Sequence, residues 1–390
     1  MLRYFSFLLR VPVLLGLGHL YAGWRLAAAA SNLSERAVIL AAILVMYLLV
    51  VAGFRMRRAV GQTGGDLVAW AGFVALGLFA WVFVLCLVRD IVLLLLVPTA
   101  FFAPAASVLY FEPIYRASAV AVPVLAIAAV LIGLYNARKV ARVVDVNVPI
   151  TNLPKSLQGF TIVQLSDVHV GATIKRGYIE RIVKAVNALQ PNAIALTGDL
   201  VDGSVASLRN DVEPLSKLVA QHGVYVVTGN HEYYSGAQEW VNEFRRIGLT
   251  VLMNEHCVIT HNTSLLIMAG VTDYGAGAFD RTQASDPTAA LRGAPDQAAV
   301  RIVLAHQPRS ASAAAAAGFD LQLSGHTHGG QFWPWKYFIP LQQPFTAGLH
   351  RLGAMHVYVS RGTGYWGPPL RLGAPSEITR IRLTCAQACG

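Results

Sequence analysis

The first 145 residues of this chain contain a series of apolar runs, and the length of these runs limits what this half can fold into. A helix needs about 20 apolar residues to cross a hydrocarbon core about 30 Å thick. Four runs meet this length, and we predict membrane-spanning helices at residues 4–24, 37–54, 67–88 and 117–135. Residues 1–145 are therefore expected to form a helical membrane domain.

Two stretches of this half leave alternatives open. The first run could be a cleavable signal peptide, because Arg3 and Arg10 precede an apolar core and a run of alanines follows it. We favour a retained helix, because the apolar stretch is long and further spans follow. Residues 91–110 are ambiguous, since Pro98 and Pro104 interrupt them: they can extend the third helix, re-enter the membrane or cross it.

Basic residues at the ends of these runs predict the orientation. The first 145 residues hold 12 Lys and Arg against 5 Asp and Glu, whereas the rest of the chain holds 19 against 16. With four spans, Arg3 and the basic clusters at 55–58 and 138–142 fall on one side, which the positive-inside rule makes cytoplasmic. We expect a protein integral to the cell (inner) membrane with its C-terminal domain in the cytoplasm. Nucleic acid is not an expected partner, because the cations flank apolar runs and form no basic stripe with aromatics.

From residue 146 the pattern changes to alternating strand-like and helix-like runs. Strands separated by helices of this length predict a layered α/β domain, which we assign to residues 146–384. Residues 385–390 form a short tail with Cys385 and Cys389, whose spacing matches no zinc site and leaves a disulfide open. The predicted strands are residues 160–165, 193–196, 224–227, 265–269, 301–305, 321–323 and 356–359, and the predicted helices are 175–189, 212–220, 237–247 and 309–317.

Five clusters of residues that commonly bind metals each follow one of these predicted strands. Ligands of open α/β sheets bind at the carboxyl ends of the strands, so these side chains are expected to meet. Residues i and i+2 of an extended segment also project to the same side, which lets such a pair aim at one point. The clusters are Asp167 with His169, Asp199 with Asp202, Asn230 with His231, His306 alone, and His326 with His328.

These ligand types predict two divalent metal ions. Mixed carboxylate, imidazole and amide ligands suit Mn²⁺, Fe or Zn²⁺ better than Ca²⁺, and no cysteine falls in the clusters, which argues against a structural zinc. Two cations about 3.5–4 Å apart hold a hydroxide between them and clamp the oxygens of an in-line displacement at phosphorus. The clusters therefore favour hydrolysis of a phosphate ester.

The set of clusters resembles the calcineurin-like metallophosphoesterases, whose pattern is DxH, GDxxD, GNHE, a single His and GHxH. The form GHTHGGQ at residues 325–331 and the preceding spans are similar to the membrane-associated bacterial branch of that family. The resemblance covers about residues 150–384. It implies a two-sheet β-sandwich flanked by helices, with the metals at the strand ends, and it leaves the membrane half without an explanation.

The resemblance also implies a role for each residue of the motifs. His231 would not be a ligand but would face the leaving-group oxygen as a general acid, and Asp202 would orient His231. The implied ligands are Asp167, His169 and His328 for one metal, Asn230, His306 and His326 for the second, and Asp199 as the bridge between both.

One departure from the family bears on the substrate. In the protein-phosphatase relatives an arginine that grips the phosphate follows GDxxD, whereas Gly203 stands here. This weakens the case for a protein phosphomonoesterase and leaves phosphodiesters and pyrophosphates. Arg361 and Arg371 are candidates for a substrate-binding guanidinium, with ordinary surface arginines as the alternative.

Two further features have two interpretations each. Glu232 either supports the metal ligands or lies at the surface. The aromatic run at residues 332–338 either packs in the core or meets a membrane interface, where Trp and Tyr are enriched.

We therefore predict a membrane-anchored, dinuclear metal-dependent phosphoesterase that hydrolyses a phosphodiester or a pyrophosphate. Its expected partners are a phosphorylated small molecule or a phospholipid-type substrate, and membrane lipid. A narrower alternative is a pyrophosphatase of the UDP-diacylglucosamine type in lipid A synthesis, and an alternative of another class is a non-catalytic metal-binding scaffold. A transporter or receptor would need charged residues inside the spans, and only Arg10 and His19 lie there.

Overall fold

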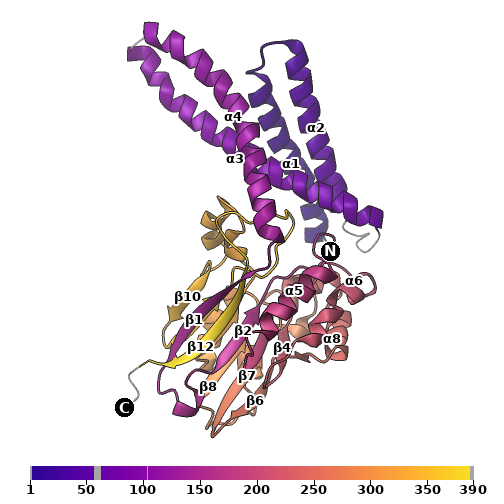
Figure 1. Cartoon of the computed structure of the whole chain (residues 1–390), viewed down its shortest axis with the longest axis vertical. Coiled ribbons are helices and arrows are strands. Elements are labelled where there is room, and N and C mark those ends of the chain that lie inside the picture. Colours follow the sequence, from indigo (N-terminus) through magenta and orange to yellow (C-terminus); the bar gives the residue numbers. More distant parts are fainter. Residues whose placement is uncertain (1, 57–62, 103, 387–390) are drawn as a thin grey trace. The chain divides into compact units, whose positions relative to one another are not determined.

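The computed structural model describes residues 2–56, 63–102 and 104–386, which divide into two compact units (Figure 1). The helical unit comprises Met1–Ala59, Thr63–Tyr135 and the short segment Gly367–Leu370. The α/β unit comprises Asn136–Trp366 and Arg371–Gly390, together with Val60–Gln62. The division therefore falls ten residues before the predicted boundary at residue 145, inside a continuous helix.

Four helices make up the helical unit: α1 (Leu2–Ala27), α2 (Leu33–Met56), α3 (Thr63–Phe102) and α4 (Pro104–Arg138). Small residues let α2 and α3 approach closely, as they do in membrane helix pairs. A Cβ added to Gly72 would lie 2.5 Å from the Cα of Gly53, so neither position has room for a side chain. Glycine at these two sites therefore sets the distance between the two helices.

Three of these helices are long and apolar enough to cross a membrane, by length and composition, within the part of the chain that the structure describes. The qualifying stretches are Leu33–Met56, Gly64–Val97 and Tyr110–Arg138. The predicted number of about four spans stays a prediction, and so does the side on which the basic clusters fall. Arg57 and Arg58 of the first cluster lie outside the described residues, as does Cys389.

The ambiguous segment after residue 90 continues the third helix as far as Phe102, which places Arg89 and Asp90 inside α3. Both charges have partners, as charged groups inside helical membrane segments usually do. Asp90 accepts hydrogen bonds from Arg25 (2.6 Å to Nη2) and from the Tyr21 hydroxyl (2.7 Å). Arg89 donates to Ser118 Oγ (3.0 Å) and to the backbone carbonyl of Tyr115 (2.9 Å).

Two six-stranded mixed sheets form the α/β unit (Figure 1). The first has the order β1-β12-β2-β3-β4-β5 and the second the order β10-β11-β9-β8-β7-β6. The first sheet contains β1 (Arg142–Ile150), β2 (Thr161–Leu165), β3 (Ala193–Thr197), β4 (Val224–Val227), β5 (Thr250–Val251) and β12 (Glu377–Cys385). The second contains β6 (Glu255–His261), β7 (Ser264–Gly270), β8 (Val300–Leu304), β9 (Leu321–Ser324), β10 (Gly348–Leu352) and β11 (Met355–Val359).

The strands alternate their side chains between two cores, as the two-residue period of a strand requires. In β8, Ile302 and Leu304 join the core between the sheets, whereas Val303 packs under the helices on the outer face. In β2, Ile162 likewise points to the inner core and Val163 to the outer one. The predicted two-sheet sandwich with flanking helices is therefore confirmed.

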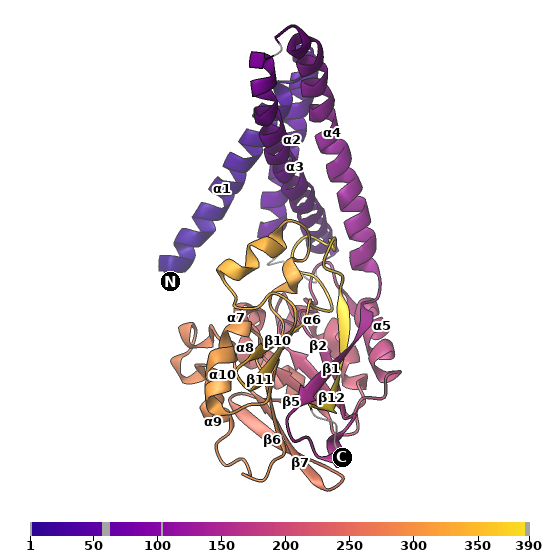
Figure 2. The ribbon, with the colours of Figure 1, turned by 90° about the vertical axis from the view of Figure 1, so that its left-hand side faces the viewer.

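Helices cover the outer face of each sheet. Helix α5 (Arg176–Asn187) buries Ile179, Ile182 and Val186 against the first sheet, at the spacing of one helix face. Helix α8 (Ala237–Arg246) adds Trp240 and Phe244 to the same core. On the second sheet α9 (Pro287–Ala290) and α10 (Ala311–Ala317) take this place (Figure 2).

Candidate metal centre

All five predicted clusters lie at the carboxyl ends of parallel strands. Strands β2, β3 and β4 are parallel neighbours in one sheet, and β8 and β9 are parallel neighbours in the other. Gln164 joins the two edges, because its amide donates to Thr197 Oγ1 and to the Ser324 carbonyl (2.9 Å each). The loops after these five strands therefore open onto one common point between the sheets.

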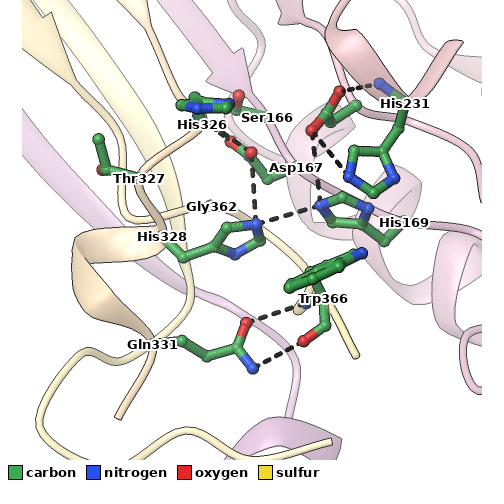
Figure 3. A network of polar contacts seen from close by, with 12 residues as sticks. Ser166, Asp167, His169, His231, His326, Thr327, His328, Gln331, Gly362 and Trp366 are labelled. Carbon is green, nitrogen blue, oxygen red and sulfur yellow. Dashed lines mark hydrogen bonds and ion pairs between the residues drawn. The ribbon is translucent and has the colours of Figure 1, made fainter. Parts of the chain in front are cut away.

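The first group at this point consists of Asp167, His169 and His328, all buried (Figure 3). His328 Nε2 lies 3.4 Å from Asp167 Oδ1 and 3.1 Å from His169 Nε2. Each of these residues offers a ligand atom within 4.8 Å of the others. Three donors that converge in this way suit a metal ion.

The second group consists of Asp199, His306 and His326. Asp199 Oδ2 lies 3.2 Å from His306 Nε2, which in turn lies 3.2 Å from His326 Nδ1. Asp199 Oδ2 is also 3.9 Å from His169 Nε2 in the first group, so this one carboxylate faces both groups. The geometry therefore brings together six of the seven residues that the family resemblance implied as ligands, namely Asp167, His169, Asp199, His306, His326 and His328.

Asn230, which the family resemblance assigns to the second metal, has an observation of its own that fits a metal ligand. Its side-chain Oδ1 is buried and has no hydrogen-bond partner among the described residues. A buried amide oxygen without a partner costs free energy that a bound cation would recover. Amide, carboxylate and imidazole donors together fit Mn²⁺, Fe or Zn²⁺, and their ligand roles stay a prediction.

The backbone at this centre is unusually strained. Asp167, His169, Asp199, His326 and His328 all have φ between 51° and 70°, in the left-handed region that non-glycine residues seldom adopt. Such residues cluster at functional sites and persist because the surrounding structure holds them. Packing leaves little freedom beside them: a Cβ on Gly325 would lie 2.2 Å from Asp167 Oδ2. The fold therefore fixes these side chains by their backbones.

Strong electrostatic coupling accompanies this burial. Burial raises the pKa of Asp167, whereas the facing imidazoles of His306 and His231 outweigh burial and hold the pKa of Asp199 well below its usual value. Burial and the neighbouring imidazole of His306 lower the pKa of His326 to about 3. A neutral His326 is the form that can act as a metal ligand.

Asp202 connects the first group to His231. Its Oδ1 lies 3.2 Å from His169 Nδ1 and 2.5 Å from His231 Nδ1. Burial would raise the pKa of Asp202, but the two imidazoles lower it well below its usual value, so the carboxylate is ionised and accepts from both rings. The Nε2 atoms of both rings are thereby left to face the centre, and that of His231 lies 3.8 Å from Asp199 Oδ2.

Glu232, for which the sequence left two interpretations, is completely buried. Its carboxylate accepts hydrogen bonds from the backbone N–H groups of Gly229 (2.6 Å), Asp199 (2.9 Å) and Leu200 (2.7 Å). Burial and the neighbouring Asp199 raise its pKa to about 7. Glu232 therefore ties the loop after β4 to the loop after β3, which carries Asp199.

The two candidate substrate-binding arginines make contacts within the chain. Arg361 donates from Nη1 to Glu377 Oε2 at 2.8 Å and keeps 31% of its side chain exposed. Arg371 is buried, and its Nη1 donates to the carbonyls of His328 (2.9 Å) and Ala374 (3.2 Å). Its contact with His328 supports a predicted ligand, and a direct contact of either arginine with substrate stays a prediction.

Most side chains of the aromatic run after the GHTHGGQ motif are exposed. Phe332 is buried, whereas Trp333, Trp335, Tyr337 and Phe338 are between 37% and 63% exposed. The sequence did not single out a further aromatic residue, Trp366, whose ring lies 5.8 Å from that of His231. No local motif marks Trp366, because it reaches the centre through a tertiary contact with Gln331.

Comparisons with known proteins agree with this geometry. The profile of the calcineurin-like phosphoesterase family matches residues 160–330. The chain is 34% identical over 262 residues to an uncharacterized metallophosphoesterase of Campylobacter jejuni, which covers 67% of this chain and 68% of that protein. It is 31% identical over 260 residues to one of Aquifex aeolicus, covering 65% of this chain and 97% of that protein.

The name of a vertebrate relative describes a transmembrane protein. The chain is 38% identical over 277 residues to a transmembrane protein with metallophosphoesterase domain of Danio rerio. This match covers 69% of the present chain and 63% of that protein, so the chain spans less than two thirds of its length.

Proposed function

Because the chain belongs to the calcineurin-like phosphoesterase family, we propose that its α/β unit is a metal-dependent phosphoester hydrolase, held at a membrane by its apolar helices. The observation that carries the proposal is the pair of donor groups that share Asp199 at the ends of five strands. Buried pairs of carboxylates and imidazoles seldom stabilise a fold better than apolar side chains of the same size. Their presence here therefore favours a functional role.

In this proposal the motif residues hold two divalent ions, with Mn²⁺, Fe and Zn²⁺ as the candidates. Such a pair supplies Lewis-acid stabilisation of the phosphoryl oxygens and lowers the pKa of water. Asp199 would serve as a ligand of both ions, and Glu232 keeps the loop of Asp199 in place through two backbone N–H groups. The ligands are Asp167, His169 and His328 on one side and Asn230, His306 and His326 on the other.

His231 acts as the general acid in this proposal. Asp202 holds its Nδ1, which leaves Nε2 to carry the proton that the leaving-group oxygen receives. The same carboxylate stabilises the protonated imidazole before the transfer. A proton transferred by a positioned side chain contributes about 10²–10⁴-fold to the rate.

The proposed substrate is a phosphodiester or a pyrophosphate. Gly203 follows Asp202 where protein-phosphatase relatives have an arginine, so this loop offers no cation for a terminal phosphate. The guanidinium of Arg361 is already paired with Glu377. Both observations favour a substrate with less terminal charge than a phosphomonoester.

A lipid-linked substrate is the finer form of the proposal. Only residues 139–141 separate α4 from β1, so the chain joins the α/β unit closely to a helix long enough to span a membrane. The exposed Trp333 and Trp335 follow the His326–His328 loop and suit a lipid interface. A pyrophosphatase of the UDP-diacylglucosamine type is a narrower candidate within this class.

Hydrolysis by the full-length, metal-loaded protein in detergent tests the proposal. The panel is a nucleotide diester, a nucleotide-sugar lipid and a phosphomonoester. We expect at least one of the first two to be hydrolysed faster than the phosphomonoester. Chelation should abolish turnover, and metal should restore it. Two bound equivalents of metal without hydrolysis of any panel member would favour the non-catalytic scaffold.

A separate experiment tests the proposed location, which is the cytoplasmic face of the inner membrane. A reporter fused after Gly390 should be active only if it is of a type that works in the cytoplasm. Activity of a reporter that requires the periplasm would show that the orientation is the opposite one and that the number of spans is not four.

A further inference from the structure

Gln331, the last residue of the GHTHGGQ motif, binds the backbone of Trp366 through both ends of its amide (Figure 3). Its Nε2 donates to the Trp366 carbonyl and its Oε1 accepts from the Trp366 N–H, both at 2.9 Å. Gln331 itself is buried, whereas Trp366 is partly exposed. The motif that carries two predicted metal ligands therefore also fixes the position of Trp366.

The ring of Trp366 nevertheless stays 42% exposed. Its centroid lies 5.8 Å from that of His231, at an interplanar angle of 73°. Tyr234, which is 52% exposed, makes a similar contact with the same imidazole at 5.2 Å and 67°. Two solvent-exposed aromatic rings therefore adjoin the one histidine that the proposed function assigns to the leaving group.

The position of these rings indicates which part of a substrate they would meet. In the proposed function the metal ions would bind the phosphoryl oxygens, whereas the leaving oxygen would receive the proton of His231. Rings in contact with His231 would therefore lie nearer to the leaving group than to the phosphoryl oxygens. An exposed aromatic face binds other planar rings by stacking, and this contact tolerates many ring types because every ring has a π-face.

We propose that Trp366 and Tyr234 form a binding surface for a leaving group that carries a planar aromatic ring, of which a nucleotide base is the common biological form. Gln331 is the positioning residue that holds Trp366 in this surface. The inference rests on the proposed function and adds the class of leaving group to it.

Matched esters that differ only in ring planarity test this surface. The probes are the benzyl and cyclohexylmethyl esters of methyl phosphate and of methyl diphosphate, assayed with the full-length protein in detergent and Mn²⁺. In the diester reaction water adds to phosphorus, the bond to the benzyloxy oxygen breaks, and this oxygen takes the proton of His231. The products are methyl phosphate and benzyl alcohol.

The wild-type protein should prefer the benzyl esters in kcat/KM. Trp366→Leu should lower kcat/KM for the benzyl esters by about 5- to 150-fold, the range that stacking on one aromatic side chain covers. The cyclohexylmethyl esters should change by less than about threefold, and Trp366→Phe should retain part of the preference. Tyr274→Leu is the matched control, because it removes another ring that is 51% exposed and should leave both rates unchanged.

The role of Gln331 requires a double-mutant cycle. Gln331→Leu should reduce the benzyl preference as Trp366→Leu does, and the double variant should lose no more than either single one, because Gln331 acts through Trp366. Additive losses would assign Gln331 a purely structural role and overturn that part of the inference.

The other outcomes separate the inference from the proposed function. Equal losses for the benzyl and cyclohexylmethyl esters in Trp366→Leu would show a merely apolar surface, as for an acyl chain, and would overturn the inference while the proposed function stands. Failure of the metal-loaded wild-type protein to cleave any of the four esters would count against the proposed function itself.

Discussion

The helical unit and the α/β unit differ in the partners of their charged side chains and in the burial of their apolar side chains. In the helical unit Asp90 has a cationic partner, Arg25, at 2.6 Å, and its large apolar side chains, such as Leu20 and Leu95, face outward. In the α/β unit most apolar side chains of the strands are buried, and Asp167 and Asp199 face imidazoles at the strand ends.

The difference between the two units lies in what completes each set of charges. The pair of Arg25 and Asp90 is complete within the chain, so it stabilises contacts between helices. The carboxylates and imidazoles of the centre instead form groups whose ligand atoms lie within 4.8 Å of one another, and Asn230 Oδ1 has no partner among the described residues. The first arrangement stabilises the fold, whereas the second could hold a metal ion.

The largest expected effect tests whether the centre depends on a single shared carboxylate. Asp199→Asn should weaken both metal sites and lower turnover by about 10³-fold or more, since metal ions contribute several kcal/mol to catalysis. His169→Ala should remove mainly one equivalent. Metal analysis of the purified variants checks this, and two full equivalents with normal turnover in Asp199→Asn would contradict the assignment.

The next effect separates chemistry from metal binding within the α/β unit. His231→Ala should keep its metals and lose about 10²–10⁴-fold in turnover, because the general acid is gone. The loss should be smaller for a nitrophenyl ester, whose leaving group needs little protonation. An equal loss for good and poor leaving groups would argue against the acid role.

A smaller effect concerns exposed apolar side chains, which occur in the α/β unit as well as in the helical unit. Acyl chains on a phosphodiester should raise kcat/KM by about tenfold or more in micelles, since burying one large apolar side chain is worth about 1.5–3 kcal/mol. Changing Trp333 and Trp335 together to Ala should remove this gain. The lipid hypothesis fails if acyl chains bring no advantage or if the two tryptophans do not affect it.

The smallest effect falls on the helical unit. Asp90→Asn should lower the free energy of unfolding in detergent by about 1 kcal/mol or less, as is usual for polar contacts between membrane helices. Metal content and turnover should not change. A loss of bound metal in this variant would show that the charges of the helical unit serve the centre, and the contrast between the units would disappear.

Much of the α/β unit could be predicted from local pattern. Seven strands could be located because alternating or continuous apolar runs reflect the two-residue period of a strand, whereas the predicted strands do not include β1, β5, β6, β10 and β12. The five ligand clusters could be found because each lies within a few residues of a strand end, where the backbone alone determines the direction of the side chains. Family resemblance then implied how they divide around Asp199.

Tertiary structure decided what depends on segments far apart in the chain. Strand β12, from the C-terminal end, lies between β1 and β2, a strand order that no local pattern encodes. Burial of Arg371 against His328 and the bonds from Gln331 to Trp366 join residues 43 and 35 positions apart. The sequence by itself determined which residues are the candidates for the chemistry, because side-chain type and strand period are local. Only packing decided what surrounds them, because the free energy of a tertiary contact depends on both of its partners at once.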